Sequence, residues 1–434
     1  MQIDREIVLD VCHLSLGFFR ATPVGVDRVD ASFAAYFLSL EVPSRKAMLL
    51  TPMGPRAIGG AAARAIFEGV QTHWREFQRP EDDSAFSRVR DALAGMAPAQ
   101  ANSPSGSLQT PRRRPLKGAL RSGFRAALLH AAAWRQREAI GIGAVYLNVS
   151  QYPLWVPSYF RWLYKRPDVK PVFMIHDLLP IEHPEFFRSQ SVRHHAGGLS
   201  VCARIGAGVI VSSRAVADAL LAYLQKRRRE PMPILIQPLP VSPVFHEPRE
   251  HDEQLAARPY FVICGTIEPR KNHLLLLNLW RELARSFGPA APKLVVAGGR
   301  GWENENIVDM LERCPEIRDH VIEAPGLSTP SLKRLFDNAR AVLMPSFAEG
   351  YGLPVAEALA SGTPVLASDL PSFRAMNEPG ITRLDPLDGL GWLAAIRHLS
   401  GAPAHWTQTR PDRPRDTFSS EAYFRRIEAF LATL

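Results

Sequence analysis

The sequence predicts an α/β protein with two doubly wound, Rossmann-like domains that face each other across a cleft. The chain has 434 residues, of which 46% are apolar, and this length is large for a single hydrophobic core. Short runs that are apolar throughout alternate with helical patterns, as in parallel sheets that helices cover on both faces. The runs stop in the proline-rich stretch 231–250 and start again at Tyr260, which indicates two domains joined there.

Eight apolar runs are the expected strands of the two sheets. They cover residues 7–11, 144–150, 171–177 and 208–213 in the first half, and 260–266, 293–299, 341–346 and 363–368 in the second. Ligands of open parallel sheets bind at the carboxyl ends of the strands. The residues that follow each run are therefore the first candidates for a functional site.

The predicted N-terminal domain covers residues 1–245, and the predicted C-terminal domain covers residues 246–418. Within the first domain, residues 97–115 are rich in proline, serine, alanine and glutamine, which predicts a flexible insertion. A helix with apolar residues at steps of four, namely Leu116, Leu120, Phe124 and Leu128, is expected directly after it. Residues 419–434 predict a final amphipathic helix that begins after a serine cap.

The charge of the chain is uneven. The net charge is +9, and residues 1–245 hold 31 lysines and arginines against 19 acidic residues, whereas the rest hold 21 against 24. The densest basic runs are 111–117 and 226–230. A basic half can bind nucleic acid, an anionic membrane surface or an acidic substrate, or it can be no more than a solubilising surface.

The cysteines and the N-terminus favour a cytoplasmic protein. The four cysteines are far apart and form no CxxC pair, so they predict neither a disulfide framework nor a zinc site. The opening MQIDREIVLDV lacks the basic and then apolar start of a signal peptide. No run approaches the roughly 20 apolar residues of a transmembrane helix, so any membrane contact is expected to be peripheral.

The stretch SFAEGYGLPVAEALASGTPV (346–365) is the strongest candidate for a site. Glu349 is expected in the loop at the carboxyl end of a strand, and Glu357 one turn into the next helix. Gly350 and Gly352 let the backbone approach a ligand, and the free N–H groups of a helix start bind anions. Such a site would bind a phosphate, with one carboxylate on each side to accept hydrogen bonds from hydroxyl groups. A nucleotide sugar has both phosphates and hydroxyl groups. The alternatives are a glycosidase acid/base pair and a Glu357 that only caps or pairs on a helix surface.

The helix in this stretch has predictable ends. Pro354 suits the first turn of a helix, and Leu353 before it is expected outside helical geometry. Gly362 suits a left-handed cap at the other end.

A second cluster, GTIEPRKNHLLLL (265–277), follows the strand at 260–266. Arg270 and Lys271 come shortly after Gly265 and directly before an apolar helix. A planar guanidinium and a compact ammonium together suit a diphosphate. Two adjacent basic residues can also be solvated surface, but their place opposite the EGYG loop (349–352) favours a site.

Several motifs resemble those of the GT-B glycosyltransferases of family 4. The segment EGYGLPVAE is similar to the E-x7-E signature of that family, and further matches are GTIEPRKNH (265–273), GGRGW (298–302), HDLLP (176–180) and the spacing of ASGTPVLASDLPSF (360–373). The resemblance is strong over roughly 260–375, fair over 145–215 and weak over the first 140 residues. It implies the GT-B fold and a transferase that uses a nucleotide sugar.

The resemblance also implies residue roles in the C-terminal domain. Glu349 would contact the hydroxyl groups of the donor sugar, and Glu357 the ribose of the nucleotide. Arg270 and Lys271, at the turn after Gly265, would hold the diphosphate and stabilise its charge as it leaves. The backbone amides from Gly350 through Tyr351 and Gly352 to Leu353 would join them.

In the N-terminal domain the resemblance points to two segments. His176 follows the strand at 171–177, and in the family this histidine lies near the donor sugar and the reacting carbon. A lone histidine can also be an ordinary loop or core residue. In GFFRATPVGVDRVD (17–30), Pro23 and Gly25 would form a loop that closes over the donor, with Arg28 at the start of a helix.

The expected function is retaining transfer of a hexose, with mannose from GDP-mannose favoured and UDP-hexoses close behind. The expected acceptor is a lipid-linked or polysaccharide glycan at the inner face of the cytoplasmic membrane. No metal or other cofactor is expected, because the sequence has no D-x-D and no GxGxxG. The alternatives are a sugar-nucleotide epimerase and a nucleic-acid-binding protein, although the basic runs lack interleaved aromatic residues, so nucleic acid is not an expected partner.

Overall fold

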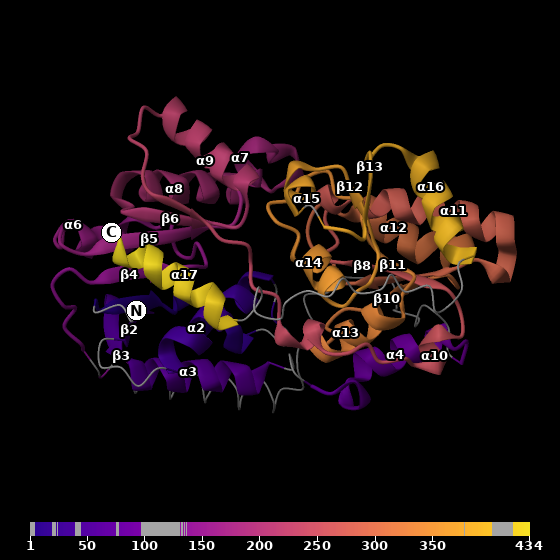
Figure 1. Cartoon of the computed structure of the whole chain (residues 1–434), viewed down its shortest axis with the longest axis horizontal. Coiled ribbons are helices and arrows are strands. Elements are labelled where there is room, and N and C mark those ends of the chain that lie inside the picture. Colours follow the sequence, from indigo (N-terminus) through magenta and orange to yellow (C-terminus); the bar gives the residue numbers. More distant parts are fainter. Residues whose placement is uncertain are drawn as a thin grey trace.

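The computed structural model describes residues 5–19, 23, 25–39, 45–74, 78–96, 131, 133, 135, 137–376, 378–401 and 420–434. Two parallel sheets, each covered by helices, lie side by side along the long axis of the molecule (Figure 1). The predicted α/β class with two doubly wound domains is therefore confirmed. The predicted insertion at 97–115 lies outside the described residues.

The N-terminal domain is built on a seven-stranded sheet with the order β3-β2-β1-β4-β5-β6-β7. Its strands are β1 (Ile7–Asp10), β2 (Arg45–Thr51), β3 (Gly54–Gly59), β4 (Val145–Asn148), β5 (Lys170–Ile175), β6 (Gly208–Val211) and β7 (Ile234–Ile236). All neighbouring strands are parallel except β2 and β3, which form an antiparallel hairpin. Because β3 runs antiparallel to β2, the sheet is mixed at one edge. The sequence did not predict β2, β3 or β7.

Helices cover both faces of this sheet. They are α1 (Cys12–Ser15), α2 (Gly25–Ser39), α3 (Gly60–His73), α6 (Arg161–Tyr164), α7 (Leu179–Glu182), α8 (Ser189–Ile205) and α9 (Arg214–Lys226). One hydrophobic core joins α2 and α3 to the sheet, and the other joins α8 and α9 to the opposite face. Because both faces are buried, the strands read as apolar throughout.

The C-terminal domain is built on a six-stranded parallel sheet with the order β10-β9-β8-β11-β12-β13. Its strands are β8 (Tyr260–Cys264), β9 (Lys293–Ala297), β10 (Val321–Glu323), β11 (Ala341–Met344), β12 (Val365–Ser368) and β13 (Ile381–Leu384). Its helices are α10 (Glu253–Ala256), α11 (His273–Phe287), α12 (Glu305–Arg313), α13 (Thr329–Asn338), α14 (Leu353–Ala360), α15 (Pro371–Met376) and α16 (Gly389–Gly401). The sequence missed the edge strands β10 and β13.

The last helix, α17 (Ser420–Ala432), lies against the N-terminal domain (Figure 1). Phe424 packs edge-to-face on Phe33 of α2, with ring centroids 5.2 Å apart, and stacks on Tyr36 at 4.3 Å. Arg45, at the start of β2, pairs with Glu428 of α17 at 2.9 Å in a buried position. Aromatic packing and one buried ion pair therefore attach the end of the chain to its first domain.

Helix α4 (Ser84–Leu93) precedes the predicted boundary at residue 245 and yet packs in the core of the C-terminal sheet (Figure 1). Its N-cap, Asp83, accepts hydrogen bonds from the backbone of Ala85 at 2.9 Å and of Ser328 at 2.9 Å. The hydroxyl of Ser331 donates to the same carboxylate at 2.7 Å. One side chain therefore caps α4 and fastens it to the start of α13.

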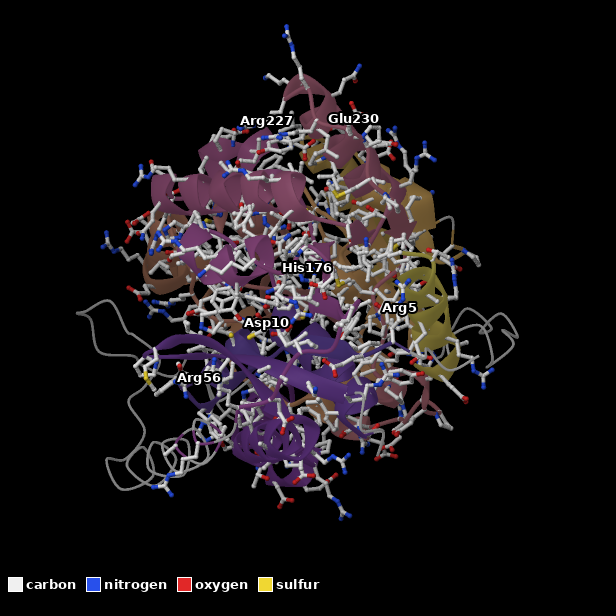
Figure 2. All side chains as sticks on the ribbon, turned by 90° about the vertical axis from the view of Figure 1, so that its left-hand side faces the viewer. Arg5, Asp10, Arg56, His176, Arg227 and Glu230 are labelled. Carbon is white, nitrogen blue, oxygen red and sulfur yellow. The ribbon has the colours of Figure 1, made fainter. Side chains whose placement is uncertain are left out.

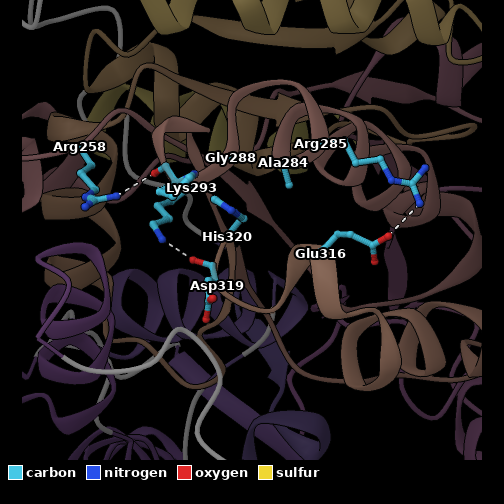
Figure 3. A pocket seen from close by; sticks show the side chains of 9 residues that line it. Arg258, Ala284, Arg285, Gly288, Lys293, Glu316, Asp319 and His320 are labelled. Atoms are coloured by element: carbon cyan, nitrogen blue, oxygen red, sulfur yellow. Dashed lines mark hydrogen bonds and ion pairs between the residues drawn. The ribbon is translucent and has the colours of Figure 1, made fainter.

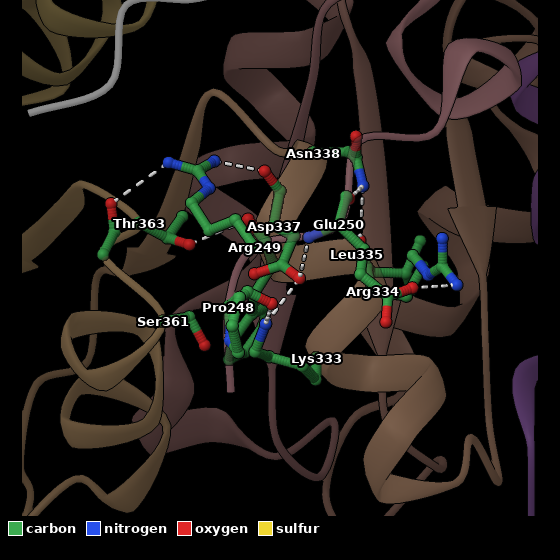
Figure 4. A network of polar contacts seen from close by, with 12 residues as sticks. Pro248, Arg249, Glu250, Lys333, Arg334, Leu335, Asp337, Asn338, Ser361 and Thr363 are labelled. Carbon is green, nitrogen blue, oxygen red and sulfur yellow. Dashed lines mark hydrogen bonds and ion pairs between the residues drawn. The ribbon is translucent and has the colours of Figure 1, made fainter. Parts of the chain in front are cut away.

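The chain that joins the domains is attached to α13 by a polar network (Figure 4). The carboxylate of Asp337 accepts from Nζ of Lys333 at 2.5 Å and from the backbone N–H of Glu250 at 3.1 Å. The guanidinium of Arg249 donates to the carbonyl oxygens of Asp337 and Gly362. The joining segment therefore belongs to the C-terminal domain from about these residues onward.

Candidate active site

The loops that follow β8 and β11 bring three predicted site residues into one ion-paired group. Nη1 of Arg270 lies 2.8 Å from Oε2 of Glu349, and Nζ of Lys271 lies 2.5 Å from Oε1 of the same carboxylate. The hydroxyl of Ser346 donates to that Oε1 at 2.8 Å. Because β8 and β11 are adjacent parallel strands, their loops leave the same edge of the sheet, where ligands bind.

Two glycines allow this close approach of loops. Gly265 has a φ of 143°, which favours glycine, and Cε of Lys271 lies 3.3 Å from the position that a Cβ on Gly265 would take. A Cβ on Gly298 would lie 1.9 Å from the carbonyl oxygen of Gly265. The tight contact between the backbones of Gly265 and Gly298 therefore holds the turn at Gly265, and the side chain of Lys271 lies over this turn.

Glu349 is ionised although it is buried. Burial by itself raises the pKa of this carboxyl group, but Arg270, Lys271 and the hydrogen bond from Ser346 hold the pKa of Glu349 at about 2. Arg270 also pairs with Glu268, whose Oε1 lies 2.8 Å from Nε of the guanidinium. Two cations and two carboxylates thus form a compact group whose charge-assisted hydrogen bonds can be shared with a phosphate or a sugar hydroxyl.

The EGYG loop touches the N-terminal domain beside His176. A Cβ on Gly350 would lie 2.7 Å from the carbonyl oxygen of His176 and 2.7 Å from Cβ of Asp177. The hydroxyl of Ser213 donates to the carbonyl oxygen of Gly350 at 3.0 Å. Nε2 of His176 lies 2.7 Å from the carbonyl oxygen of Val149, and burial lowers the pKa of this histidine. A neutral imidazole therefore lies next to the loop that carries the site glutamate.

Glu357 also reaches the N-terminal domain. Its Oε1 accepts a hydrogen bond from Nη1 of Arg28 on α2 at 2.8 Å, and its side chain is 2% exposed. The alternative of a glutamate that caps or pairs on a helix surface is correct in the pairing, but the carboxylate is buried in an ion pair between the domains. The expected contact of Glu357 with a ribose stays a prediction.

The start of α14 differs by one residue from the expectation. The helix begins at Leu353, which was expected outside it, and Pro354 lies within its first turn. Gly352 makes the turn into the helix with a φ of 85°, and a Cβ there would lie 2.3 Å from the ring of Phe373. Because the left-handed turn is at Gly352, the helix begins at Leu353, one residue before the start expected from Pro354. The predicted end is present, since Gly362 has a φ of 73°.

The remaining predicted residues lie around this group. Gly25 is the exposed first residue of α2, and Pro23 before it is half-buried. Among the described residues, no atom lies within 4 Å of the position that a Cβ on Gly25 would take, so Gly25 is not packed against the ion-paired group. Tyr351 is half-buried, and burial raises its pKa to about 12. Leu353 is half-buried at the start of α14.

A second polar group lies at the carboxyl end of β1, and sequence reasoning missed it. Nδ1 of His13 lies 2.7 Å from Oδ2 of Asp30, and its Nε2 lies 3.6 Å from Oδ1 of Asp27. Burial raises the pKa of Asp30 to about 6, against the effect of His13. The signal was available, because Asp27 and Asp30 are three residues apart in a helix and therefore share a face.

Other partners were missed although they lie in the quoted motifs. Glu268 stands two residues before Arg270, Ser346 opens the stretch that contains Glu349, and Asp177 directly follows the predicted histidine. Their contacts depend on loop conformation, which residue spacing alone does not give. Arg28 was expected only to start a helix, and its partner lies in the other domain.

The basic run 226–230 lies at the surface of the N-terminal domain. Figure 2 places Arg227 and Glu230 at the outer tip of the domain, whereas His176 and Asp10 lie near its centre. Residues 226–230 are exposed. The other basic run, 111–117, lies outside the described residues.

A cavity of about 410 Å³ in the C-terminal domain lies away from the ion-paired group (Figure 3). It is lined by Arg258, just before β8, and by Lys293, the first residue of β9. Nζ of Lys293 donates to the carbonyl oxygen of Asp319. These residues mark the amino ends of the strands, so the cavity is at the opposite edge of the sheet from the candidate site.

No helix among the described residues is long and apolar enough to cross a membrane. Within the same part of the chain, no three His, Cys, Asp or Glu side chains are grouped as metal ligands would be.

Comparison with known sequences identifies the C-terminal domain. Residues 247–384 match the family "Glycosyl transferases group 1". The serotype-specific mannosyltransferase WbdA of Escherichia coli is 28% identical over 218 residues, which cover 46% of this chain and 26% of WbdA. The O-antigen chain mannosyltransferase B of Escherichia coli is 35% identical over 152 residues, which cover 35% of this chain and 39% of that protein. The chain thus matches well under half the length of either relative.

Comparison with solved structures concerns the fold. Anabaena Alr3699/HepE in complex with UDP and glucose has a TM-score of 0.60 at 14% identity, over 99% of this chain and 100% of that one. TarM has a TM-score of 0.51 at 17% identity, over 66% of this chain and 54% of that one.

The two doubly wound domains have the GT-B fold, and cationic and carboxylate side chains lie on the loops where the domains meet. Within the C-terminal domain, residues 247–384 are similar to the glycosyl transferases group 1 family. The resemblance seen in the sequence is thereby confirmed.

Proposed function

We propose that the protein transfers a mannose residue from a nucleotide sugar to a growing glycan of a surface polysaccharide. The observation that carries this proposal is the ion-paired group of Arg270, Lys271 and Glu349, which meets the His176 segment where the domains touch. The similarity to the O-antigen chain mannosyltransferase B supports mannose as the sugar and a polysaccharide as the product.

The proposed donor is GDP-mannose. Arg270 and Lys271 would hold its diphosphate, with the N-terminus of α14 adding backbone N–H groups. These groups would balance the charge of the diphosphate without a metal ion. A UDP-hexose is the alternative donor, and the complex of Anabaena HepE with UDP-glucose supports it.

The proposed reaction retains the configuration of the sugar. The bond between C1 and the phosphate oxygen breaks, and the acceptor hydroxyl forms its bond to C1 on the same face. Its proton passes to the leaving phosphate oxygen, so the products are a nucleoside diphosphate and a glycoside. Arg270 and Lys271 stabilise the charge that develops on the diphosphate, while Glu349 positions the sugar through its hydroxyl groups.

The proposed acceptor is a lipid-linked or polysaccharide glycan, met in the cytoplasm at the inner face of the membrane. The excess of basic residues in the first 245 residues supports attraction to an anionic surface. No nucleic acid is part of the proposal.

A thermal-shift screen without metal tests the donor. GDP-mannose, UDP-glucose, UDP-galactose, UDP-N-acetylglucosamine, GDP and UDP are compared, because a ligand at a hundred times its Kd stabilises the protein by about 2.7 kcal/mol. A response to GDP and GDP-mannose is expected. A response to uridine nucleotides alone would move the proposal to a UDP-hexose, and no response to any of them would contradict it. NMR of the product then shows whether the anomeric configuration is retained.

A further inference from the structure

A cavity of about 360 Å³ lies between α8, the loop that follows β4 and Trp302 of the C-terminal domain. Twelve of its thirteen lining residues belong to the N-terminal domain. Ser150 and Ile175 line it, and they are the chain neighbours of Val149 and His176, which contact each other as described above. The cavity therefore lies beside the His176 segment and has the size of a small-molecule site, roughly 300–1,000 Å³.

Aromatic rings form much of the wall of this cavity. Trp155 stacks on His194 of α8 with ring centroids 4.9 Å apart and planes 4° apart. Trp302 also lines the cavity, and its Nε1 donates to the carbonyl oxygen of Phe186 at 3.1 Å, while its ring centroid lies 6.4 Å from that of Phe187. Flat apolar surfaces with a few polar groups among them suit a pyranose ring, which has both C–H faces and hydroxyl edges.

Gln151 provides a polar group that has no partner. It lines the cavity, and its Nε2 is buried without a hydrogen bond among the described residues. Its backbone is held at a φ of 61°, with its N–H donating to Oδ1 of Asn148 at 3.1 Å. A buried donor without an acceptor is costly, and a non-glycine residue in this conformation is often part of a functional site. A sugar hydroxyl would supply the acceptor.

We propose that this cavity binds a neutral sugar ring of the acceptor glycan, with Trp155 and Trp302 against its faces and Gln151 on a hydroxyl group. The inference rests on the proposed function and names the acceptor subsite for it. None of the described residues that line the cavity is Asp, Glu, Lys or Arg, which favours a neutral sugar over an acidic or phosphorylated one.

The position of the cavity separates it from the donor site. The ion-paired group that would hold the donor lies wholly on loops of the C-terminal domain, and none of its members lines the cavity. Only Trp302 comes from that domain. The subsite is therefore complete only while Trp302 contacts the Phe186 segment, so acceptor binding would favour the domain arrangement seen here.

Saturation-transfer NMR with the full chain tests the site. The probes are methyl α-mannoside and methyl α-glucoside, each with and without GDP. We expect signal transfer to at least one methyl glycoside, and loss of it in Gln151→Ala and Trp302→Ala. In steady-state assays with α-mannobiose as acceptor and saturating donor, these variants should raise the acceptor KM at least about tenfold.

Matched variants keep the test independent of folding. Trp302→Phe retains a ring and should recover most of the acceptor affinity, and Tyr164→Ala, which removes a ring that is 52% exposed on α6, should change nothing. Nucleotide affinity by calorimetry should stay within about twofold in Gln151→Ala. If the chain binds nucleotide sugars but Gln151→Ala and Trp302→Ala leave glycoside binding and acceptor KM unchanged, the subsite is wrong and the proposed function stands. If no nucleotide sugar binds, the proposed function itself is wrong.

Discussion

Glu349 is a buried carboxylate that keeps its charge because two cations contact it. Arg270 has a second ion-pair partner in Glu268, whereas the ammonium of Lys271 forms its ion pair with Glu349. Removing the charge of Glu349 therefore leaves Lys271 buried without its ion-pair partner, and a phosphate is the kind of group that would replace it.

Glu349→Gln should destabilise the free protein by about 3–5 kcal/mol at pH 7, because one partner of a buried ion pair is lost. The folded pKa of about 2 lies below the ordinary value of 4.5, so this contribution is complete above about pH 4.5 and is lost as the pH falls towards 2. Urea unfolding of both proteins from pH 3 to 7 measures it. The difference should narrow only below about pH 4.5.

Two controls define what the Glu349 result means. Glu316→Gln removes a carboxylate that pairs with Arg285 in a largely exposed position, and only a small change is expected. A nucleoside diphosphate should restore part of the stability of Glu349→Gln. Equal loss in both variants would show that burial of the group has no special consequence.

The pair of Arg28 and Glu357 raises a separate question, since Glu357 can hold a ribose, bridge the domains, or do both. Glu357→Ala should weaken donor binding by roughly tenfold to a hundredfold if it contacts the ribose, since a hydrogen bond to a charged group contributes about 1.5–3 kcal/mol. Arg28→Ala should then weaken it much less. Calorimetry on both variants and on the double variant separates the cases. Identical losses in all three would show that the carboxylate serves only its arginine partner.

At the residue scale, the sequence predicted which loop residues lie together but not the contacts between distant segments. Arg270, Lys271 and Glu349 lie together because each follows a strand, and adjacent parallel strands end at the same edge. The ion pair of Arg28 with Glu357 joins positions 329 residues apart. The sequence around Arg28 gives no sign of Glu357, and the sequence around Glu357 gives none of Arg28. Only the packing of the two domains creates the contact.

At the element scale, α4 lies within the N-terminal part of the sequence but packs against the C-terminal domain. Asp83→Ala removes an N-cap and leaves buried donors of Ser328 and Ser331 without their acceptor. We expect a loss of about 2–4 kcal/mol in unfolding free energy, measured by guanidinium unfolding. Asp82→Ala changes the exposed neighbour and should have almost no effect. A loss below about 1 kcal/mol for Asp83→Ala would contradict the fastening described for α4.

Two of the missed strands depart from the pattern that was sought. The expected strands were those that are apolar throughout, a pattern that requires burial on both faces. β13 is an edge strand whose residues are only half-buried or exposed, and β2 begins with Arg45 and Lys46. The short strand β7 is apolar, but it lies within the proline-rich stretch 231–250 that was interpreted as the domain junction. Arg45 is buried in β2 because Glu428 of α17 neutralises it. Edge position and a partner at the far end of the chain are both invisible in a local sequence pattern.

At the scale of the whole molecule, the domains meet through contacts on several loops. Arg28 pairs with Glu357, Ser213 donates to Gly350, and Trp302 donates to the Phe186 segment. Most of these are single polar contacts, which suits an interface that opens to admit substrates and closes for transfer. At Gly350 the loop lies so close to the N-terminal domain that a side chain has no room.

Gly350→Ala should therefore hold the domains apart. Its Cβ would lie 2.7 Å from the His176 carbonyl oxygen and from Cβ of Asp177, a distance that the backbone of the opposing domain must relieve by moving. Small-angle X-ray scattering should show a larger radius of gyration, and turnover should fall more than donor affinity, because the proposed diphosphate contacts of Arg270 and Lys271 lie on the C-terminal domain. Gly401→Ala, where no described atom lies within 4 Å of the new Cβ, is the control. If Gly350→Ala keeps both the radius of gyration and the turnover of the unmodified protein, this contact does not limit closure, and the arrangement of domains seen here is not the one in which sugar is transferred.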